Sequence, residues 1–349
     1  MAAITKHVFY VNRLTHPVFA DLLGARDDIR LDRLENDTAQ TGIDVVLSRA
    51  HAYQIGASRD EIPRHLHGTA ALLAGAPDML VMSSSGAGYD TIDVDACTAA
   101  GVLAVNQAGG NREAVAEHVL GMMLLLSKRA IQADRHMRRE AGISRIAYTG
   151  NNIHGKTVGI VGLGNTGSRL AELCSGLFAM PVLACDPYLS AEQIAAHGAE
   201  KVGLDQLLHR ADFVSLHCPR SIETLGMIGL REFGLMKPTA WFFNAARGGL
   251  HDEMALEAAL ASGAIAGAGL DVWAVEPPPP EHPLLRFDNV IATPHIAGVT
   301  AESREMTARM AAEQVLDILD GRRPPRLLNP EVWPAYAERF FRIFGFQPG

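Results

Sequence analysis

Short hydrophobic runs alternate with helix-like segments along most of the chain. Between Lys156 and His295 the runs KTVGIVG, PVLACD, ADFVSLH, AWFFNA, AIAGAGLDV and NVIATPH recur, with helical stretches between them. Runs this short, rich in Val, Ile and Ala, predict strands that are buried on both faces. Their alternation with helices predicts a parallel sheet covered by helices on both sides, which is the pattern of a doubly wound α/β domain.

The first hundred residues have the same alternation in a weaker form. Residues 7–11 (HVFYV) and 78–84 (DMLVMSS) predict strands, and residues 16–24 (HPVFADLLG) predict a helix. The strand at 78–84 leads into SGAGYD, a glycine-rich turn. The segment 39–67 fits neither period, and we assign it no element.

Two longer helices are predicted on either side of the central alternating region. Residues 111–140 predict one long helix, because apolar side chains recur at the spacing of a helix face at Val115, Val119, Met122, Met123 and Leu126. Residues 141–154 are rich in Gly, Ser, Asn and Thr and predict a loop. Residues 300–321 predict the second helix, and we expect the residues after it to pack on the N-terminal half or on a neighbouring subunit.

Length and composition indicate a globular protein of two domains. The chain has 349 residues, of which 48% are hydrophobic and 20% charged, and its net charge is −8. This charge argues against a nucleic acid or an anionic membrane as partner. The longest apolar run, VLGMMLLL, is far shorter than a membrane span, and the N-terminal residues lack the features of a secretory signal. We therefore expect a cytoplasmic location.

The cysteines give no sign of a metal site or a disulfide framework. They are scattered, with no CxxC pair and no histidine at metal-ligand spacing, at Cys97, Cys174, Cys185 and Cys218. We expect reduced packing residues and no bound metal.

A dinucleotide fingerprint follows the predicted strand KTVGIVG. Gly162, Gly164 and Gly167 have the G-x-G-x-x-G spacing and open a predicted helix, which is the context that makes the pattern informative. The three glycines would permit a tight turn, close approach of a pyrophosphate, and close packing of helix on strand. The alternative is a glycine-rich turn that binds nothing.

An acidic residue at the end of the next strand favours NAD over NADP. A ribose-binding acid is expected about 20 residues after the fingerprint, and Asp186 ends the run VLACD at that distance. Its carboxylate would repel a 2′-phosphate, and no arginine follows it in DPYLS. The sequence therefore predicts NAD as cofactor.

Three polar stretches end later strands and carry residue types suited to hydride transfer. They are NAARGGL with Arg247, DVWAVEP with Glu276, and TPHIAG with His295. Ligands of a doubly wound sheet bind outside the carboxyl ends of its strands, so we expect these side chains to meet. Reduction of a carbonyl by a nicotinamide requires a proton, which histidine supplies near neutral pH.

The other two residues would support that histidine. A carboxylate orients an imidazole and favours its protonated form, and an arginine offers paired donors to a 2-oxo acid. Four prolines follow Glu276 and are expected to hold it in place. Taken singly, the three could be a surface ion-pair residue, a solvated loop acid and a turn histidine, but their joint occurrence after a nucleotide fingerprint favours catalysis.

Residues 78–300 resemble the D-isomer-specific 2-hydroxyacid dehydrogenases, which include phosphoglycerate dehydrogenase and glyoxylate/hydroxypyruvate reductase. The matching stretches are SGAGYDTIDVDACTAAGVLAVNQAGGNREAVAEH, GKTVGIVGLGNTGSRLA, LHCPRSIETLGMIG, LMKPTAWFFNAARGGL, GAGLDVWAVEP and NVIATPHIAG. The resemblance implies two Rossmann-like doubly wound domains, with the nucleotide domain (107–298) inserted in a substrate domain (1–106 and 299–349). It also implies a homodimer and an NAD-dependent interconversion of a small D-2-hydroxy acid and its 2-oxo acid.

The resemblance assigns a role to each candidate site residue. Arg247 would orient the substrate, Glu276 would pair with the histidine, and His295 would donate the proton. The backbone N–H groups of Ala87 and Gly88 would hold the substrate carboxylate. The expected NAD contacts are Gly162, Gly164, Asn165, Thr166 and Gly167 at the pyrophosphate, Asp186 on the ribose, Cys218, Pro219, Ala245 and Ala246 along the adenosine and nicotinamide, Asp271 at the carboxamide, and Gly298 nearby.

Some features depart from the family pattern and leave the substrate open. The stretch VMSSSGAGYD is neutral apart from its acid, which disfavours a phosphorylated substrate. His251 stands where the family has an aliphatic residue, and we expect a surface or packing histidine. The alternative function is a non-catalytic NAD(H)-sensing protein similar to the corepressors of this family. A formate-type dehydrogenase would have glutamine in place of Glu276.

Overall fold

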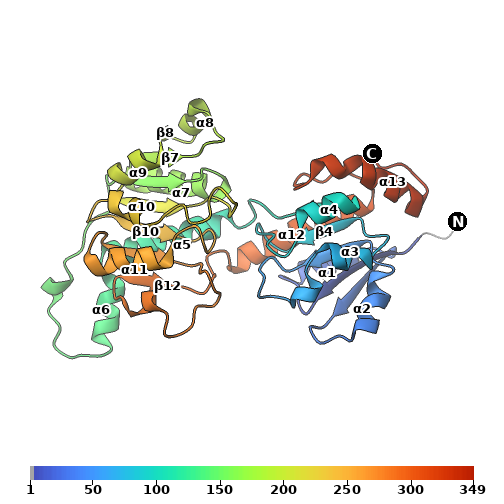
Figure 1. The fold of residues 1–349 in the computed structure, drawn as a ribbon, viewed down its shortest axis with the longest axis horizontal. Helices are drawn as coiled ribbons and strands as arrows, with labels where there is room; N and C mark the ends of the chain where they lie inside the picture. Colours follow the sequence, from blue (N-terminus) through green and yellow to red (C-terminus); the bar gives the residue numbers. More distant parts are fainter. Residues whose placement is uncertain (1–3) are drawn as a thin grey trace. The chain divides into compact units, whose positions relative to one another are not determined.

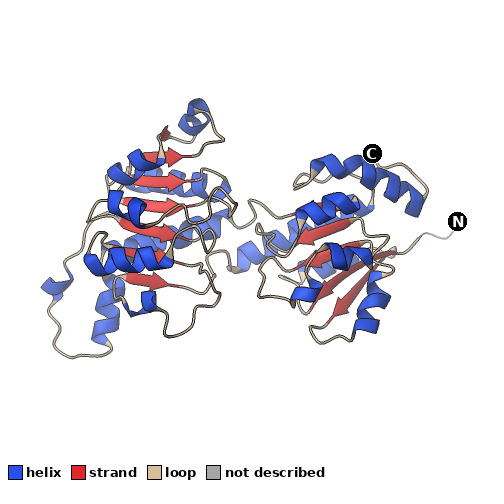
Figure 2. Cartoon of the chain, in the orientation of Figure 1, coloured by secondary structure: helices blue, strands red, loops and turns tan. Residues whose placement is uncertain are grey.

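The protein is described here by a computed structural model, which covers residues 4–349. The chain divides into two compact units, shown as ribbons in Figures 1 and 2. Unit 1 comprises the described residues up to Asn111 together with Ala301–Gly349, and unit 2 comprises Arg112–Thr300. Unit 2 is thus inserted in unit 1, and each unit is an α/β layer structure, as the sequence predicts. The domain limits expected at 106/107 and 298/299 stay a prediction.

Unit 1 contains a five-stranded parallel sheet in the order β2-β1-β3-β4-β5. Its strands are β1 (Lys6–Val11), β2 (Ile29–Leu34), β3 (Ala52–Ile55), β4 (Val81–Ser84) and β5 (Leu103–Val105). Its helices are α1 (Val18–Gly24), α2 (Gln40–Leu47), α3 (Ala70–Ala74), α4 (Val94–Ala100), α12 (Ala301–Leu319) and α13 (Trp333–Phe344), with short 3-10 turns η1 (Arg64–Leu66) and η4 (Pro330–Val332). The unassigned segment 39–67 therefore contains α2, β3 and η1.

Both faces of this sheet are covered by helices. One core cluster packs α2, α3 and α4 against the sheet, and a second packs α1, α12 and α13 against it. The inner strands β3 and β4 are buried along their whole length, which explains why their side chains, apart from Tyr53 and Gln54, are apolar or small rather than alternating. The sheet order reverses between β1 and β3, because β2 lies on one side of β1 and the later strands lie on the other.

The C-terminal residues pack on unit 1, which is one of the two outcomes expected for them. Tyr336 and Phe340 of α13 are fully buried in the core beside α12. Arg339 donates to the carbonyl oxygens of Met79 at 2.8 Å and Ala100 at 2.6 Å. These contacts fix α13 against the strand and helix ends of the N-terminal half.

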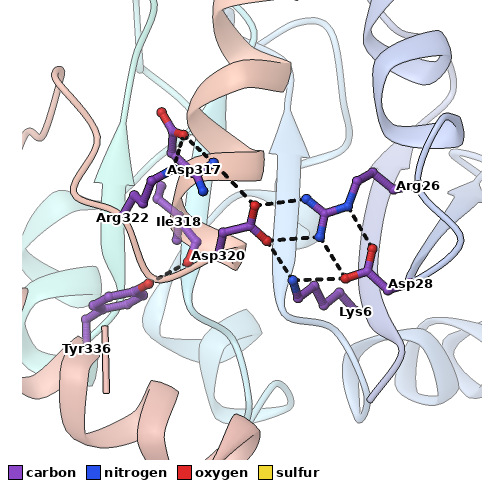
Figure 3. A network of polar contacts seen from close by, with 8 residues as sticks. All are labelled: Lys6, Arg26, Asp28, Asp317, Ile318, Asp320, Arg322 and Tyr336. Atoms are coloured by element: carbon purple, nitrogen blue, oxygen red, sulfur yellow. Dashed lines mark hydrogen bonds and ion pairs between the residues drawn. The ribbon is translucent and has the colours of Figure 1, made fainter. Parts of the chain in front are cut away.

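A cluster of charges fastens the end of α12 to the first strand, as Figure 3 shows. Asp320 accepts from Lys6 Nζ at 2.8 Å and from Arg26 Nη1 at 2.9 Å, and Asp28 lies 3.0 Å from the same lysine. Tyr336 closes this region by donating its hydroxyl to the carbonyl oxygen of Ile318 at 2.5 Å. Lys6 is nearly fully buried, so its charge requires these carboxylates.

Unit 2 contains a seven-stranded parallel sheet in the order β12-β11-β10-β9-β6-β7-β8. Its strands are β6 (Val158–Val161), β7 (Val182–Cys185), β8 (Ala199–Lys201), β9 (Phe213–Leu216), β10 (Trp241–Asn244), β11 (Gly267–Leu270) and β12 (Val290–Ala292). Its helices are α5 (Arg112–Ser127), α6 (Ala130–Met137), α7 (Asn165–Phe178), α8 (Ala191–Ala196), α9 (Leu204–Arg210), α10 (Leu230–Leu235) and α11 (Glu253–Ser262), with 3-10 turns η2 (Arg145–Tyr148) and η3 (Pro283–Arg286).

The unit 2 sheet reverses its order between β6 and β9. Helices α5 and α7 pack on one face of the sheet, and α9, α10 and α11 pack on the other. In a doubly wound sheet, ligands bind at such a reversal, outside the carboxyl ends of the strands. The loops after β6 and β9 are therefore the first place to examine for a cofactor.

The single helix predicted for residues 111–140 is wrong. The structure has two helices, α5 and α6, separated at Lys128 and Arg129, where Arg129 has φ 55°. The carbonyl oxygen of Ser127 accepts the N–H of Asn151 at 2.7 Å, so the loop after α6 takes the place of the next helical turn. The apolar spacing could not reveal this competing bond. Within residues 4–349, no helix is both long and apolar enough to cross a membrane.

Candidate active site

The glycine-rich loop joins β6 to α7 at the point where the unit 2 sheet reverses. Gly162 has φ 90°, and a Cβ there would lie 2.7 Å from the backbone nitrogen of Cys218, after β9. A Cβ on Gly167 would lie 2.2 Å from the carbonyl oxygen of Gly162. Both positions therefore require glycine for close packing.

Gly164 has a different reason to be glycine. A Cβ there would meet nothing within 4 Å, and the residue is the N-cap of α7 without a side-chain cap. The first N–H groups of α7 are thus left for another acceptor, and the space beside them is open. Such a helix end suits a pyrophosphate, and these residues fit a dinucleotide.

A pocket of about 1010 Å³ opens beside this loop. Five residues predicted to bind NAD line it, namely Gly162, Gly164, Asp186, Cys218 and Pro219. The carboxylate of Asp186 accepts the N–H groups of Leu163 and Tyr188, each at 3.0 Å. The acid thus holds the glycine-rich loop in place and still has lone pairs for a ribose hydroxyl.

Thr166, in the first turn of α7, contacts a half-buried histidine. Its Oγ1 lies 3.0 Å from His217 Nδ1, and Ser215 Oγ lies 2.9 Å from His217 Nε2. Burial lowers the pKa of His217 to about 4, so the imidazole is neutral near pH 7. His217 was not among the predicted site residues, although it ends the strand ADFVSLH one residue before Cys218.

The catalytic candidates lie at the ends of β10, β11 and β12, on the other side of the reversal. His295 Nδ1 lies 2.7 Å from Glu276 Oε2, and Glu276 Oε1 accepts the N–H of Trp273 at 3.0 Å. The carboxylate is therefore fixed by one backbone bond and aimed at the imidazole. The peptide bond between Glu276 and Pro277, the first of the four prolines, is cis.

The pair shifts the pKa of both partners toward their charged forms. Burial acts to lower the pKa of His295, but the hydrogen bond and charge of Glu276 outweigh it, so the pKa is raised above its ordinary value. Burial likewise acts to raise the pKa of Glu276, but the same hydrogen bond leaves it lowered. A partly exposed imidazole that holds its proton near neutral pH is suited to donate it.

The positive charge of Arg247 affects the pKa of both members of this pair. Its positive charge opposes protonation of His295 and favours the ionised form of Glu276. Its Nη1 donates to the carbonyl oxygen of Ala246 at 2.7 Å. The three residues singled out in the sequence are thus brought into one electrostatic neighbourhood.

Asn244 shapes the turn that carries Arg247. Its side chain is fully buried, accepts the N–H of Ala246 at 3.0 Å and donates to the carbonyl oxygen of Arg247 at 2.9 Å. It also contacts His251 Nδ1 at 3.0 Å, and His251 is buried against Phe242, which makes it a packing histidine. Asn244 was not among the predicted site residues, although a polar residue at the end of an apolar strand could have indicated it.

Asp271 shapes the turn that carries His295. Its carboxylate is fully buried and accepts from Thr293 Oγ1 at 2.5 Å and from the N–H groups of Ile296 and Ala297 at 2.8 Å each. Its carbonyl oxygen accepts the N–H of His295 at 2.7 Å, and His295 itself has φ 58°. Asp271 thus folds the loop that presents the histidine, and its expected contact with a carboxamide stays a prediction.

The remaining predicted residues occupy the same strand ends or the other unit. Ala245 and Ala246 follow β10, and Gly298 lies in the loop after β12. Ala87 and Gly88 belong to unit 1, in the loop after β4. Within residues 4–349 neither of their N–H groups has a hydrogen-bond acceptor, whereas the carbonyl of Ala87 accepts from Asn106 Nδ2 at 2.7 Å.

Comparison with known proteins shows what kind of molecule has this geometry. A sequence model described as "D-isomer specific 2-hydroxyacid dehydrogenase, NAD binding domain" matches residues 120–297, about half of the chain. The chain belongs to this family. Because the matched segment is the family's NAD binding domain, the prediction of NAD as cofactor is confirmed.

Relatives of this chain carry several names. It is 39% identical over 270 residues to a D-3-phosphoglycerate dehydrogenase of Archaeoglobus fulgidus, covering 77% of this chain and 51% of that protein. It is 38% identical over 268 residues to a glyoxylate reductase of Korarchaeum cryptofilum, covering 75% of this chain and 80% of that protein. The chain thus spans about half the length of the phosphoglycerate dehydrogenases it matches.

The fold agrees with the sequence comparison. A crystal structure of a glyoxylate reductase from Paecilomyes thermophila superposes with a TM-score of 0.83 at 26% identity, covering 94% of this chain and 99% of that one. These relatives are named as dehydrogenases and reductases. The alternative of a non-catalytic NAD(H) sensor is therefore not supported.

Proposed function

We propose that this 2-hydroxyacid dehydrogenase interconverts a small D-2-hydroxy acid and its 2-oxo acid, with His295 as acid and base. The observation that carries the proposal is the 2.7 Å contact between His295 Nδ1 and Glu276, in the electrostatic reach of Arg247. The chemistry that NADH would supply when bound is a hydride for the carbonyl carbon. His295 gives its proton to the carbonyl oxygen, and Glu276 stabilises the imidazolium before that transfer.

A cationic side chain and a pair of backbone N–H groups would bind different parts of the substrate. Arg247 would face the 2-oxo group and polarise the carbonyl. The N–H groups of Ala87 and Gly88, which have no hydrogen-bond acceptor among residues 4–349, would take the carboxylate. In the reverse direction, neutral His295 would accept the hydroxyl proton as the hydride leaves the substrate carbon.

The cofactor residues would act by binding alone. The N–H groups at Asn165 and Thr166 would receive the pyrophosphate, and Gly164 would give it room. Asp186 would bind the ribose hydroxyls, and its charge would repel a 2′-phosphate. We also expect a homodimer and a cytoplasmic location, which light scattering and fractionation would test.

The direct experiment follows NADH absorbance while a panel of 2-oxo acids is added, including glyoxylate, hydroxypyruvate and phenylpyruvate. Turnover of at least one is expected. His295→Ala should slow it by a factor on the order of 10² to 10⁴. Arg247→Ala should raise KM and lower kcat, because the arginine contacts the substrate in both ground and transition states. Full activity in the His295 variant would end this assignment, and NADH binding without any turnover would favour a sensor.

A further inference from the structure

Unit 1 has a cavity of its own at the reversal of its sheet, between β1 and β3. Its volume is about 70 Å³, and an ordered water needs on the order of 10–15 Å³ by the same measure. Residues after β1, at the end of β3 and after β4 line it, including Arg13, Gln54 and Ser85. This is the position at which doubly wound sheets bind ligands, and it has room for a compact polar group.

Two arginines from distant parts of the chain face this cavity. Arg13 follows β1, and Arg304 lies in the first turns of α12. Within residues 4–349 neither guanidinium has an ion pair or a hydrogen bond to protein, whereas about half of the other arginines are paired with carboxylates. Arg304 is half-buried and Arg13 is exposed.

One acid also lines the cavity, and it is already engaged. Glu61 Oε2 accepts the N–H of Ser58 at 3.2 Å. Among the described residues that line the cavity, the other charged ones are the two arginines, so together with Glu61 they give it a net positive charge. An anion would be attracted to it, less strongly than if Glu61 were absent.

Gln54 provides an independent sign of a ligand. It lies in β3 beside Tyr10 of β1 and Ser83 of β4, is only 6% exposed, and lines the cavity. Within residues 4–349 its amide makes no hydrogen bond, and its Oε1 is buried without a partner. A buried amide left unpaired is costly, so a ligand that bonds to it is expected. Rotation of the amide by half a turn would offer N–H₂ in place of the oxygen.

We propose that this cavity receives a second anionic group of the substrate, a carboxylate or a phosphate at the far end of a 2-oxo acid. The proposal rests on the proposed function, because the cavity adjoins the loop whose N–H groups would take the first carboxylate. Ser85 lines the cavity and is followed directly by Gly86, Ala87 and Gly88. Arg304 and Arg13 would bind the second anion, and Gln54 would complete its hydrogen bonds.

This inference changes the expectation drawn from the sequence. The stretch VMSSSGAGYD is neutral apart from its acid, and it disfavoured a phosphorylated substrate. The positive charge comes instead from Arg13 and Arg304, which the fold places beside that stretch. The substrate class is therefore a 2-oxo acid that carries a second anionic group rather than an uncharged or apolar side chain.

The test compares matched substrates that differ in the second charge. One pair is 2-oxoglutarate and 2-oxopentanoate, and the other is 3-phosphohydroxypyruvate and hydroxypyruvate. In at least one pair, we expect a higher kcat/KM for the member that carries the second anionic group. The pair that shows this preference identifies the second group as a carboxylate or a phosphate. Arg304→Gln should lower kcat/KM for that substrate by roughly 10- to 100-fold and leave glyoxylate within about 2-fold. Arg13→Gln should have a smaller effect because Arg13 is exposed.

Two further variants sharpen the comparison. Glu61→Gln removes the opposing charge and should raise kcat/KM for the charged substrate. Arg309→Gln is the matched control, because Arg309 lies on the same helix, pairs with Glu305 at 3.0 Å and does not line the cavity. It should leave all four rates unchanged. Equal losses on substrates with and without the second anionic group, or no preference in the wild type, would overturn the proposal.

A binding measurement separates this proposal from the proposed function. If no 2-oxo acid is turned over, the proposed function fails, and calorimetry with inorganic phosphate and with glutarate then decides the cavity. Saturating NADH is present so that the glycine-rich loop is occupied. Binding that is lost in the Arg13→Gln/Arg304→Gln double variant supports an anion site. Binding that is unchanged in the double variant, or absent in the wild type, overturns it.

Discussion

Replacing Glu276 by glutamine tests the acid–imidazole pair without changing its shape. The carboxylate has two partners, the N–H of Trp273 at 3.0 Å and His295 Nδ1 at 2.7 Å. A glutamine satisfies the Trp273 N–H only with its oxygen, so its N–H₂ must face Nδ1. Because Nδ1 then has to accept a hydrogen bond, it carries no proton, and the imidazolium is disfavoured.

The expected loss of reduction rate in Glu276→Gln follows from the charged hydrogen bond between Glu276 and His295 that the substitution removes. A hydrogen bond between charged partners contributes on the order of 1.5–3 kcal/mol, which corresponds to roughly 10- to 150-fold. The pKa of His295 is raised in the wild type, so the protonated acid is present below that pKa and is lost as pH rises through it. Removing the charge of Glu276 lowers this pKa, and the fall of the reduction rate should move to lower pH.

The assay is the pH dependence of kcat/KM for NADH-driven reduction of the best 2-oxo acid, from about pH 5 to 9. The deficit of Glu276→Gln should be small at the acid end and approach 10- to 150-fold near pH 8. Glu253→Gln is a matched control, because Glu253 accepts the N–H of Ala274 at 2.8 Å and lies 3.2 Å from His282 Nε2. A deficit that is the same at every pH, or an equal loss in the control, would refute this role of Glu276.

Two other predictions concern the cofactor and the stability of unit 1. Asp186→Asn should raise the ratio of kcat/KM with NADPH to that with NADH by roughly 10-fold, because it removes a charge that repels a 2′-phosphate; an unchanged ratio would mean that Asp186 does not face the ribose. Lys6 and Arg26 lower the pKa of Asp320 from 3.8 to about 2, which corresponds to about 2 kcal/mol of stability near pH 7. A lowered pKa stabilises the fold above about pH 4, and this contribution is lost as pH falls toward 2. Asp320→Asn should therefore lower the free energy of unfolding by about that amount at pH 7 and by much less at pH 3, as measured by urea titration.

The local features of the nucleotide fold were predictable because they depend on short stretches. The apolar strand β6 and the glycine spacing after it lie within one short stretch, although the backbone that excludes a side chain at Gly162 belongs to Cys218, after β9. The break between α5 and α6 was not predictable, because the bond that ends α5 comes from Asn151, beyond the second helix. Apolar spacing indicates which face of a helix is buried. It does not indicate that a distant N–H group will bond to the carbonyl oxygen at the end of the helix.

Some residues of the candidate site could be predicted from sequence motifs, and others are recognised only in the folded structure. Arg247, Glu276 and His295 could be named because each stands directly after a predicted strand. The residues that hold them were harder to find, since the Asn244 side chain bonds to backbone groups of Ala246 and Arg247, and Trp273 holds Glu276 by its own backbone N–H. Arg13 and Arg304 were missed altogether, because only the sheet order of unit 1 brings them to one cavity.

The positions of the catalytic candidates Arg247 and His295 are set by backbone bonding rather than by their own packing. Arg247 and His295 each stand in a turn whose backbone is bonded to one buried polar side chain, Asn244 or Asp271. Replacing either anchor would leave buried N–H or C=O groups unpaired, which costs on the order of 1–3 kcal/mol for each group. The turn would then rearrange to recover those bonds, and the reacting side chain would move with it. Substitutions at Asn244 and Asp271 should therefore reduce turnover and stability together, whereas Glu276→Gln reduces turnover alone.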